Sequence, residues 1–289
     1  MSPSLEIAII SLPDSKRRRR ITQWMESSPH PWRFFDACRV PAAGDPQYDG
    51  VRALALHGTE LQAGEIGCFA SHFRLLKQFE ATGRYGWLLV VEDDVLIDLG
   101  FPFDMFLMIA EQADLKYLKL YSRYVVQCHK VGDRIFGRSI VRFHGSLLNL
   151  PGRPTLPLGT QGYLISREGA SSFIRSVDAI IRPVDWQFDR YWENGLGSYA
   201  VFPYPLIELV SETTITSTRR RAPPHLRGWF RYNSSRFVDR LRRRMHDHNL
   251  KQRDRAIAHA IAAMKAQGRK PPLMGAREGA YPRWHPWHG

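Results

Sequence analysis

Three consecutive carboxylates, Glu92-Asp93-Asp94, are the residues whose type and spacing most clearly suggest chemistry. They directly follow residues 87–91 (WLLVV), an apolar run that is typical of a buried strand. The end of such a strand delivers neighbouring carboxylates to a sheet edge, where a divalent ion can bridge them to a diphosphate. Hard oxygen ligands favour Mg²⁺ or Mn²⁺. The alternative interpretation is a solvated acidic turn without a chemical role.

Alternating strand and helix patterns surround this acidic cluster. Residues 5–12 (LEIAIISL) predict a buried strand, and Pro13-Asp14-Ser15 predict a turn and an N-cap before a helix that starts at Lys16. Further strands are predicted at 32–35, 117–121 and 162–166, and further helices at 61–81, 101–113 and 167–177. This alternation predicts an α/β fold with a mostly parallel central sheet, whose ligand site lies beyond the carboxyl ends of the strands.

The net charge of +13 is concentrated near the C-terminus. Residues 218–289 hold 18 Lys and Arg against 4 Asp and Glu, whereas residues 1–217 hold 23 against 24. A basic groove through the larger part is therefore not indicated, and no nucleic-acid partner is expected. We expect residues 1–217 to form a catalytic domain and residues 218–289 to form a basic, Arg-rich amphipathic C-terminal segment.

Cysteine content and hydropathy indicate a cytoplasmic chain. Cys38, Cys68 and Cys128 are an odd number without a C-x-x-C pair, so neither a disulfide framework nor a zinc site is suggested. The apolar run 5–12 is too short for a signal sequence and precedes the arginines instead of following them. Because no charge-free apolar stretch of about 18 residues occurs, any membrane contact is expected to be peripheral.

Residues 234–267 show a basic amphipathic pattern. Phe237, Leu241 and Met245 recur every four residues with arginines between them, and Ile257, Ile261 and Met264 continue the apolar pattern. Such helices lie on anionic membranes, so we expect contact with the inner face of the cytoplasmic membrane. The alternative is a helix that packs on the catalytic domain with its charges solvated.

Ordered motifs in the first third of the chain carry a family resemblance. They are Ile10-Ser11-Leu12 with Ser15 and Arg18-Arg19, Phe35-Asp36-Ala37, Gly64-Glu65-Ile66-Gly67-Cys68 with Ser71-His72, and Glu92-Asp93-Asp94-Val95. Weaker similarities follow at 159–166 with Gly169-Ala170, at 183–186 and at 211–217. Over about residues 5–217 the chain resembles glycosyltransferase family 25, the lipooligosaccharide galactosyltransferase family that also includes collagen galactosyltransferases. Pro13-Asp14 depart from the family, which more often has polar or basic residues there.

The resemblance implies a GT-A fold, which is a Rossmann-like nucleotide-sugar-binding fold. It also implies a UDP-sugar donor, usually UDP-galactose, a Mn²⁺ or Mg²⁺ ion held by the acidic motif, and inversion at the anomeric carbon. The expected metal ligands are Asp94 and Glu92, with Asp93 near the ribose or a metal-bound water. The expected activity is transfer of a hexose to an oligosaccharide acceptor of lipopolysaccharide or lipooligosaccharide.

An inverting transfer needs a general base that takes the proton from the attacking acceptor hydroxyl. Asp185 in the sequence P-V-D-W is the candidate, because it lies in the acceptor-side half beside an aromatic residue that can pack on a sugar ring. The alternative is that Asp185 is the N-cap of a helix over 186–192. Asp189 and Glu208 are reserve candidates for the base.

Donor contacts are expected from residues at and after the first two strands. Ser11 and Leu12 end the first strand, and Asp36 ends the second, where a uracil or ribose contact competes with a simple turn. Arg18 and Arg19 can pair with the diphosphate or form a solvated helix face.

Three further residues are candidates for donor contacts. Ser71 and His72 lie on the helix before the acidic motif, where His72 either reaches the donor or is a satisfied core histidine. Gln161 precedes a glycine that permits close backbone approach to the donor sugar, against the alternative of a plain strand. Cys68 is interpreted as a small buried apolar residue without chemistry.

Two other classes of function use the same features. A metal-dependent phosphotransferase or nuclease would use the acidic cluster together with a nucleic-acid-binding basic tail. The nearly neutral charge of residues 1–217 argues against it, because a nuclease lines its site with basic residues. A non-catalytic membrane adaptor would act through the C-terminal segment alone.

Overall fold

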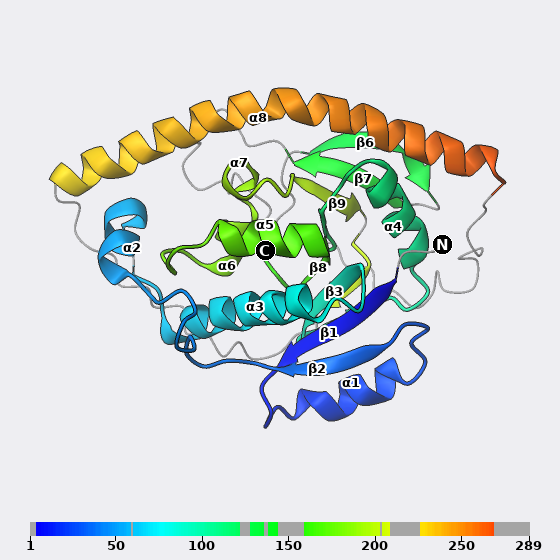
Figure 1. Cartoon of the computed structure of the whole chain (residues 1–289), viewed down its shortest axis with the longest axis horizontal. Helices are drawn as coiled ribbons and strands as arrows, with labels where there is room; N and C mark the ends of the chain where they lie inside the picture. Colours follow the sequence, from blue (N-terminus) through cyan, green and yellow to red (C-terminus); the bar gives the residue numbers. More distant parts are fainter. Residues whose placement is uncertain are drawn as a thin grey trace, which may run out of the picture.

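The computed structural model describes residues 4–58, 60–121, 128–135, 138–143, 159–202, 204–208 and 226–268. Its elements are β1 (Leu5–Ser11), α1 (Arg17–Met25), β2 (Trp32–Asp36), α2 (Gly50–His57), α3 (Ala63–Thr82), β3 (Trp87–Glu92), β4 (Val95–Ile97), α4 (Phe103–Gln112), β5 (Tyr117–Lys119), β6 (Cys128–Ile135), β7 (Arg138–Phe143), β8 (Gly162–Ser166), α5 (Arg167–Arg175), α6 (Val184–Phe188), α7 (Tyr191–Asn194), β9 (Tyr199–Phe202), β10 (Leu206–Glu208) and α8 (Leu226–Ala266). The predicted α/β class is confirmed, and α3 and β3 occupy the ranges that their patterns predicted (Figure 1).

The central sheet is mixed, so the prediction of a mostly parallel sheet is wrong. Its strand order is β2-β1-β3-β8-β5-β9-β7-β6, and β4 pairs separately with β10. Strands β2, β1 and β3 are parallel, as are β5 and β9, whereas β8 runs antiparallel to both of its neighbours, β3 and β5. Hydrophobic patterns identify strands but not their direction, and the pairing of β8 is decided by contacts distant in sequence.

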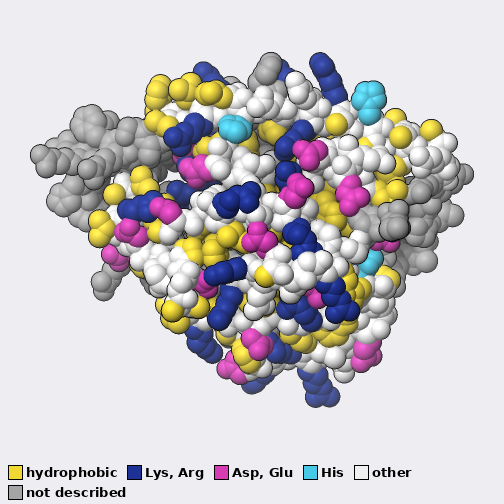
Figure 2. All heavy atoms as spheres, viewed as in Figure 1, with side chains coloured by type: hydrophobic (Ala, Val, Ile, Leu, Met, Phe, Trp, Pro, Cys, Tyr) yellow, Lys and Arg dark blue, Asp and Glu magenta, His cyan; other side chains and the backbone are white. Residues whose placement is uncertain are grey.

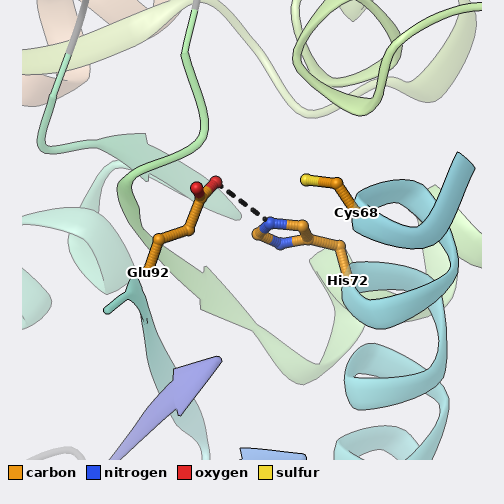
Figure 3. A group of neighbouring side chains, drawn as sticks. All are labelled: Cys68, His72 and Glu92. Carbon is orange, nitrogen blue, oxygen red and sulfur yellow. Dashed lines mark hydrogen bonds and ion pairs between the residues drawn. The ribbon is translucent and has the colours of Figure 1, made fainter. Parts of the chain in front are cut away.

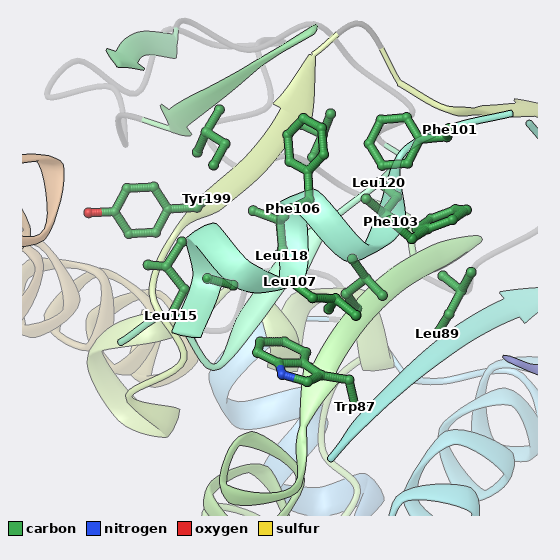
Figure 4. Packing of buried hydrophobic residues seen from close by; sticks show 14 of the residues in the cluster. Trp87, Leu89, Phe101, Phe103, Phe106, Leu107, Leu115, Leu118, Leu120 and Tyr199 are labelled. Carbon is green, nitrogen blue, oxygen red and sulfur yellow. The ribbon is translucent and has the colours of Figure 1, made fainter. Parts of the chain in front are cut away.

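The two faces of the sheet carry separate apolar cores, because successive strand residues point to opposite faces. One core contains Ile7 and Ile9 of β1 together with side chains of α1, α4 and α8. The other contains Ala8 and Ile10 of β1 together with side chains of α3, α5 and α6. Figure 4 shows side chains of α4 packed among those of the strands in the first core. The fold is therefore a sheet between two helical layers.

Helix α8 packs on the sheet domain through its C-terminal part. Figure 1 shows it arching across the molecule, and it contacts α2, α4, α7 and β6. Ile257, Ile261 and Met264 are almost fully buried and belong to the core that α4 helps to form. These residues therefore complete the domain, as the second interpretation of the amphipathic pattern predicts.

Ion pairs also hold α8 against the sheet domain. The Asp254 carboxylate accepts hydrogen bonds from Arg142 Nε at 3.0 Å and from the Tyr199 hydroxyl at 2.9 Å. Nearer the start of α8, Asp239 pairs with the Arg190 guanidinium at 2.5 and 2.9 Å. The boundary expected at 217/218 lies outside the described residues. No helix in the described ranges is both long and apolar enough to cross a membrane.

Candidate active site

The register of the parallel strands brings the sequence-predicted residues to one sheet edge. Because β1 lies between β2 and β3, Ser11 is opposite Asp36, and Ile10 is opposite Glu92. The acidic motif therefore emerges beside the turn that joins β1 to α1. This is the edge at which open α/β sheets bind ligands.

Asp93 fastens the end of β3 to that turn. Its carboxylate accepts hydrogen bonds from the Ser11 and Ser15 hydroxyls, both at 2.7 Å, and from Arg17 Nη1 at 2.8 Å. The Ser15 amide also donates to the Leu12 carbonyl at 3.0 Å, which closes the turn. Three donors on one carboxylate hold the loop after β1 in a fixed position. A ribose or water contact by Asp93 and donor contacts by Ser11 and Leu12 stay predictions.

Arg18 and Arg19 differ in their surroundings. The Arg18 guanidinium donates to the Ser11 carbonyl at 2.8 Å and to Asp36 Oδ1 at 2.5 Å, and it lies 4.7 Å from the centre of the Phe34 ring. Arg19 is exposed on the surface of α1. Only Arg18 is therefore directed to the strand ends, where it joins β1 to β2.

Glu92 lies in a partly buried hydrogen-bonded cluster. Its Oε1 accepts a hydrogen bond from the Thr160 hydroxyl at 2.7 Å and lies 3.4 Å from His72 Nε2 (Figure 3). The other ring nitrogen of the fully buried His72 lies 2.9 Å from the Tyr163 hydroxyl. Burial opposes ionisation of Glu92, but His72 and Thr160 outweigh it and lower the pKa of this carboxyl. Glu92 is therefore held as a carboxylate at neutral pH.

Negative charge converges around Cys68 of α3. Burial raises the pKa of the Cys68 thiol well above its ordinary value, and the carboxylates of Glu92, Asp185 and Asp94 add to the shift. The carboxylates come from two separate parts of the sequence, Glu92 and Asp94 from the acidic motif and Asp185 from α6. Geometry places Glu92 near the predicted general base, because the adjacent residues Gly159 and Thr160 donate hydrogen bonds to Asp185 and to Glu92.

Asp185 is not the N-cap of a helix, so that alternative is wrong. Helix α6 begins at Val184 with Pro183 as its N-cap, which places Asp185 in the first turn. Its carboxylate accepts from the Gly159 amide at 3.1 Å and from the Trp186 amide at 2.9 Å. These two backbone donors orient the carboxylate.

The reserve base Asp189 is poorly placed for an acceptor. Its side chain is 4% exposed and forms an ion pair with the equally buried Lys119 at 2.8 Å. Burial raises the pKa of Asp189 to about 7, although the Lys119 charge opposes the shift. The pair links β5 to the turn after α6 inside the domain. The side chain of Glu208, the other reserve, lies outside the described residues.

Ser71 and Gln161 contribute to the frame of the site. The Ser71 hydroxyl accepts from the Cys38 amide at 2.8 Å and donates to the Gly67 carbonyl at 2.7 Å, which joins α3 to the segment after β2. The buried Gln161 accepts a hydrogen bond from the Glu92 amide at 3.0 Å through its backbone carbonyl. A donor contact by either side chain stays a prediction.

Thr160 is the member of the site that sequence reasoning missed, and Cys68 is a member to which it assigned no chemistry. Cys68 and His72 are four residues apart on α3 and thus share one helix face, which is a readable signal. Cys68, His72 and Glu92 each direct a ligand atom to a common point, all within 4.8 Å of one another. Nothing in the sequence marks Thr160, because its partner Glu92 is 68 residues away.

The comparison with protein families agrees with the expected family. The model of glycosyltransferase family 25 (LPS biosynthesis protein) matches residues 4–188. No curated protein matches the chain. Among solved structures, the chain is similar to a glycosyltransferase involved in the glycosylation of the major capsid of PBCV-1, with 12% identity and a TM-score of 0.30. That similarity covers 58% of this chain and 62% of the other.

Proposed function

Because the chain belongs to glycosyltransferase family 25, it is a glycosyltransferase, and we propose that it transfers galactose from UDP-galactose to a lipopolysaccharide oligosaccharide. The observation that supports this proposal is that two adjacent residues contact both kinds of carboxylate: the Gly159 amide donates to Asp185 at 3.1 Å, and the Thr160 hydroxyl donates to Glu92, the last residue of β3, at 2.7 Å. In the transfer, the acceptor hydroxyl attacks the anomeric carbon of the sugar while the charged UDP leaves the same carbon. Glu92 contacts His72 and Thr160, whereas Asp185 contacts only backbone amides among the hydrogen bonds described. Carboxylates in different surroundings can take different roles, one near the leaving group and one as the base for the acceptor hydroxyl.

Glu92 and Asp94 are the residues that would hold Mn²⁺ or Mg²⁺. The lowered pKa of Glu92 keeps a hard oxygen ligand charged, and the negative charge that accumulates near Cys68 favours a cation in its vicinity. When bound, such an ion neutralises the negative charge that grows on the departing UDP. The residues fit the ion, because carboxylate oxygens are the ligands that both metals prefer.

Asp185 would act as the general base. As the acceptor oxygen forms its bond to the anomeric carbon, the bond from that carbon to the diphosphate breaks, and the hydroxyl proton passes to the Asp185 carboxylate. Attack on the side opposite the leaving group inverts the anomeric carbon. The amides of Gly159 and Trp186 keep the carboxylate oriented during this step.

Release of UDP tests donor, metal and reaction class together. UDP-galactose, UDP-glucose and their N-acetyl forms are supplied to the full chain with Mn²⁺, with Mg²⁺ or with chelator. We expect Asp94→Ala to lose metal-dependent UDP release without loss of thermal stability, because it removes a metal ligand instead of core packing. Asp104→Ala is the matched control, since Asp104 is an exposed carboxylate in the first turn of α4. Undiminished turnover in chelator would contradict the metal proposal.

The same assay separates the phosphotransferase or nuclease alternative, which releases no UDP from a UDP-sugar. On the face seen in Figure 2, basic and acidic side chains are interspersed and no continuous basic groove is visible. This distribution does not favour a polyanion on that face.

We propose further that the outer face of α8 attaches the enzyme to the anionic inner surface of the cytoplasmic membrane. Phe237, Leu241 and Met245 are 65%, 53% and 67% exposed, which is unusual for large apolar side chains on one helix face. Positions two residues apart on a helix lie about 200° apart. Because Asp239 and Arg243 face α7, where they meet Arg190 and the Trp192 ring, the three apolar side chains face away from the domain.

Charge supports an anionic partner for this face. Arg242 and Arg244 are exposed beside Leu241 and Met245, and each basic residue near an anionic surface contributes about 1 kcal/mol. Co-sedimentation with phosphatidylglycerol vesicles should fall for Leu241→Glu but not for Ala258→Glu, an exposed position of α8 outside the apolar stripe. Binding should also weaken as salt rises. Equal binding by both variants would place the membrane contact elsewhere.

A further inference from the structure

We propose that Cys68, His72 and Glu92 form a binding site for Zn²⁺ or a similar transition-metal ion. Their ligand atoms, one each from sulfur, nitrogen and oxygen, lie within 4.8 Å of one another. Figure 3 shows the thiol, the imidazole and the carboxylate directed to a common space between α3 and the end of β3. No other group of three or more His, Cys, Asp or Glu side chains comes this close within the described part of the chain.

Two elements of secondary structure place the three donors. Cys68 and His72 are four residues apart on α3, so their side chains lie one above the other on the face that meets the sheet. Glu92 is the last residue of β3, which brings its carboxylate to the level of that helix face. The three donors therefore lie on a helix and a strand that are packed in the domain, and not on loops.

The surroundings of His72 match those of a metal-binding histidine. The Tyr163 hydroxyl lies 2.9 Å from His72 Nδ1, which leaves Nε2 facing Glu92 at 3.4 Å. A hydrogen bond to one ring nitrogen is the usual way in which proteins orient the other toward a metal. Thr160 donates its hydroxyl proton to Glu92 at 2.7 Å, so it orients one of the three donors.

The donor set selects a different class of ion from the one proposed for the diphosphate. Thiolate and imidazole ligands favour Zn²⁺, whereas Mg²⁺ and Mn²⁺ prefer oxygen ligands. Around tetrahedral Zn²⁺, with bonds of about 2.0–2.3 Å, neighbouring donor atoms lie about 3.5 Å apart. The His72–Glu92 distance of 3.4 Å already meets this value. The longest separation in the group, at most 4.8 Å, has to close by about one ångström, which a rotation of the Cys68 side chain on α3 can supply.

Sharing of Glu92 makes the two ions competitors. Zn²⁺ held by Cys68 and His72 would occupy the carboxylate that is proposed to bind Mn²⁺ or Mg²⁺, so added Zn²⁺ should inhibit sugar transfer. This inhibition rests on the proposed function, whereas binding of Zn²⁺ or Co²⁺ by the three residues does not.

Titration of the full chain with Co²⁺ tests the site directly. We expect one equivalent of Co²⁺ to produce a thiolate-to-cobalt charge-transfer band in the near ultraviolet, and Zn²⁺ to displace it. Cys68→Ser should abolish the band and weaken Zn²⁺ binding at least tenfold. Cys38→Ser is the matched control, because Cys38 is also a half-buried free thiol but lies outside the cluster.

The result that would overturn the site is a band or a Zn²⁺ affinity that is the same in wild type and Cys68→Ser, or the absence of stoichiometric binding. A loss of the band in Cys38→Ser but not in Cys68→Ser would also overturn it. Far-ultraviolet circular dichroism of both variants shows whether each is folded, and the exchange of sulfur for oxygen changes the side chain little. A band without UDP release would contradict the proposed function and leave the metal site intact.

Discussion

Two methionines on α8 offer a direct measurement of how far the C-terminal helix belongs to the domain. Met264 is 3% exposed and packs in the core formed with α4, whereas Met245 is 67% exposed on the outer face of the same helix. The perturbation is the same in both cases, Met→Ala. Because alanine is at least as good a helix former as methionine, intrinsic helix propensity does not destabilise either variant.

The magnitude follows from burial. Met264→Ala removes most of a side chain that is packed on all sides, and such changes in a core cost about 2–5 kcal/mol. Since Met264 lies two positions before the end of α8, the helix end can relax into part of the cavity. We therefore expect the lower part of that range, about 2–3 kcal/mol. Met245→Ala should change the free energy of unfolding by less than about 0.5 kcal/mol.

Equilibrium unfolding in urea, followed by circular dichroism and by tryptophan fluorescence, measures the free energy of unfolding of each variant. Thermal unfolding measures the Tm. The Tm of Met264→Ala should fall by roughly 4–8 °C and that of Met245→Ala by at most about 2 °C. Equal effects of the two substitutions, or an effect of Met264→Ala below about 0.5 kcal/mol, would refute the packing of α8 on the domain. For the same reason, removal of residues 218–289 is expected to expose the core and destabilise the sheet domain.

Three further outcomes are expected. Asp185→Asn should lower kcat by about 10²–10⁴ with donor binding retained, as measured by steady-state kinetics and UDP-sugar titration, because an amide cannot take the acceptor proton. Gly169→Ala should lower the Tm despite the better helix propensity of alanine, because the added Cβ would lie 2.4 Å from the Lys116 carbonyl oxygen. The pKa of Asp189 is raised to about 7, so the folded chain holds a proton there that the unfolded chain has lost, and this group's contribution to stability falls as pH rises from about 4 to about 7. Asp189→Asn should make stability, measured by urea unfolding at several pH values, less dependent on pH in that window.

Local patterns in the sequence were sufficient for part of the fold. The helical spacing of apolar residues predicted α3, and the run WLLVV predicted β3, because burial of one helix face or of a whole strand leaves a periodic signal. The apolar spacing does not indicate helix α2, although its ends carry readable signals. Asp49 accepts a hydrogen bond from the Arg52 amide at the N-terminus, and Gly58 adopts the left-handed conformation at the C-terminus. A short helix with weak apolar spacing is recognised only by such caps.

The candidate site could likewise be predicted only in part from the sequence. The sequence alone indicated that the three carboxylates from Glu92 to Asp94 stand at a strand end, and the ordered motifs around them indicated the family, which the match to residues 4–188 confirms. It could not show that Glu92 turns to His72 and Thr160 while Asp93 turns to the loop after β1. Glu92 and Asp93 are consecutive residues at a strand end, so their side chains point in opposite directions. Which elements each side chain then meets depends on strand order and register.

Helix α8 shows the division most clearly. The spacing of its apolar residues determined that it is an amphipathic helix, but the pattern is the same whether that face meets a membrane or a protein core. Tertiary structure decided the matter residue by residue: Ile257, Ile261 and Met264 are buried against the domain, whereas Leu241 and Met245 are exposed. The sequence thus determined what each segment can bury, and only the folded arrangement decided where it is buried, because burial depends on partners that are distant in the chain.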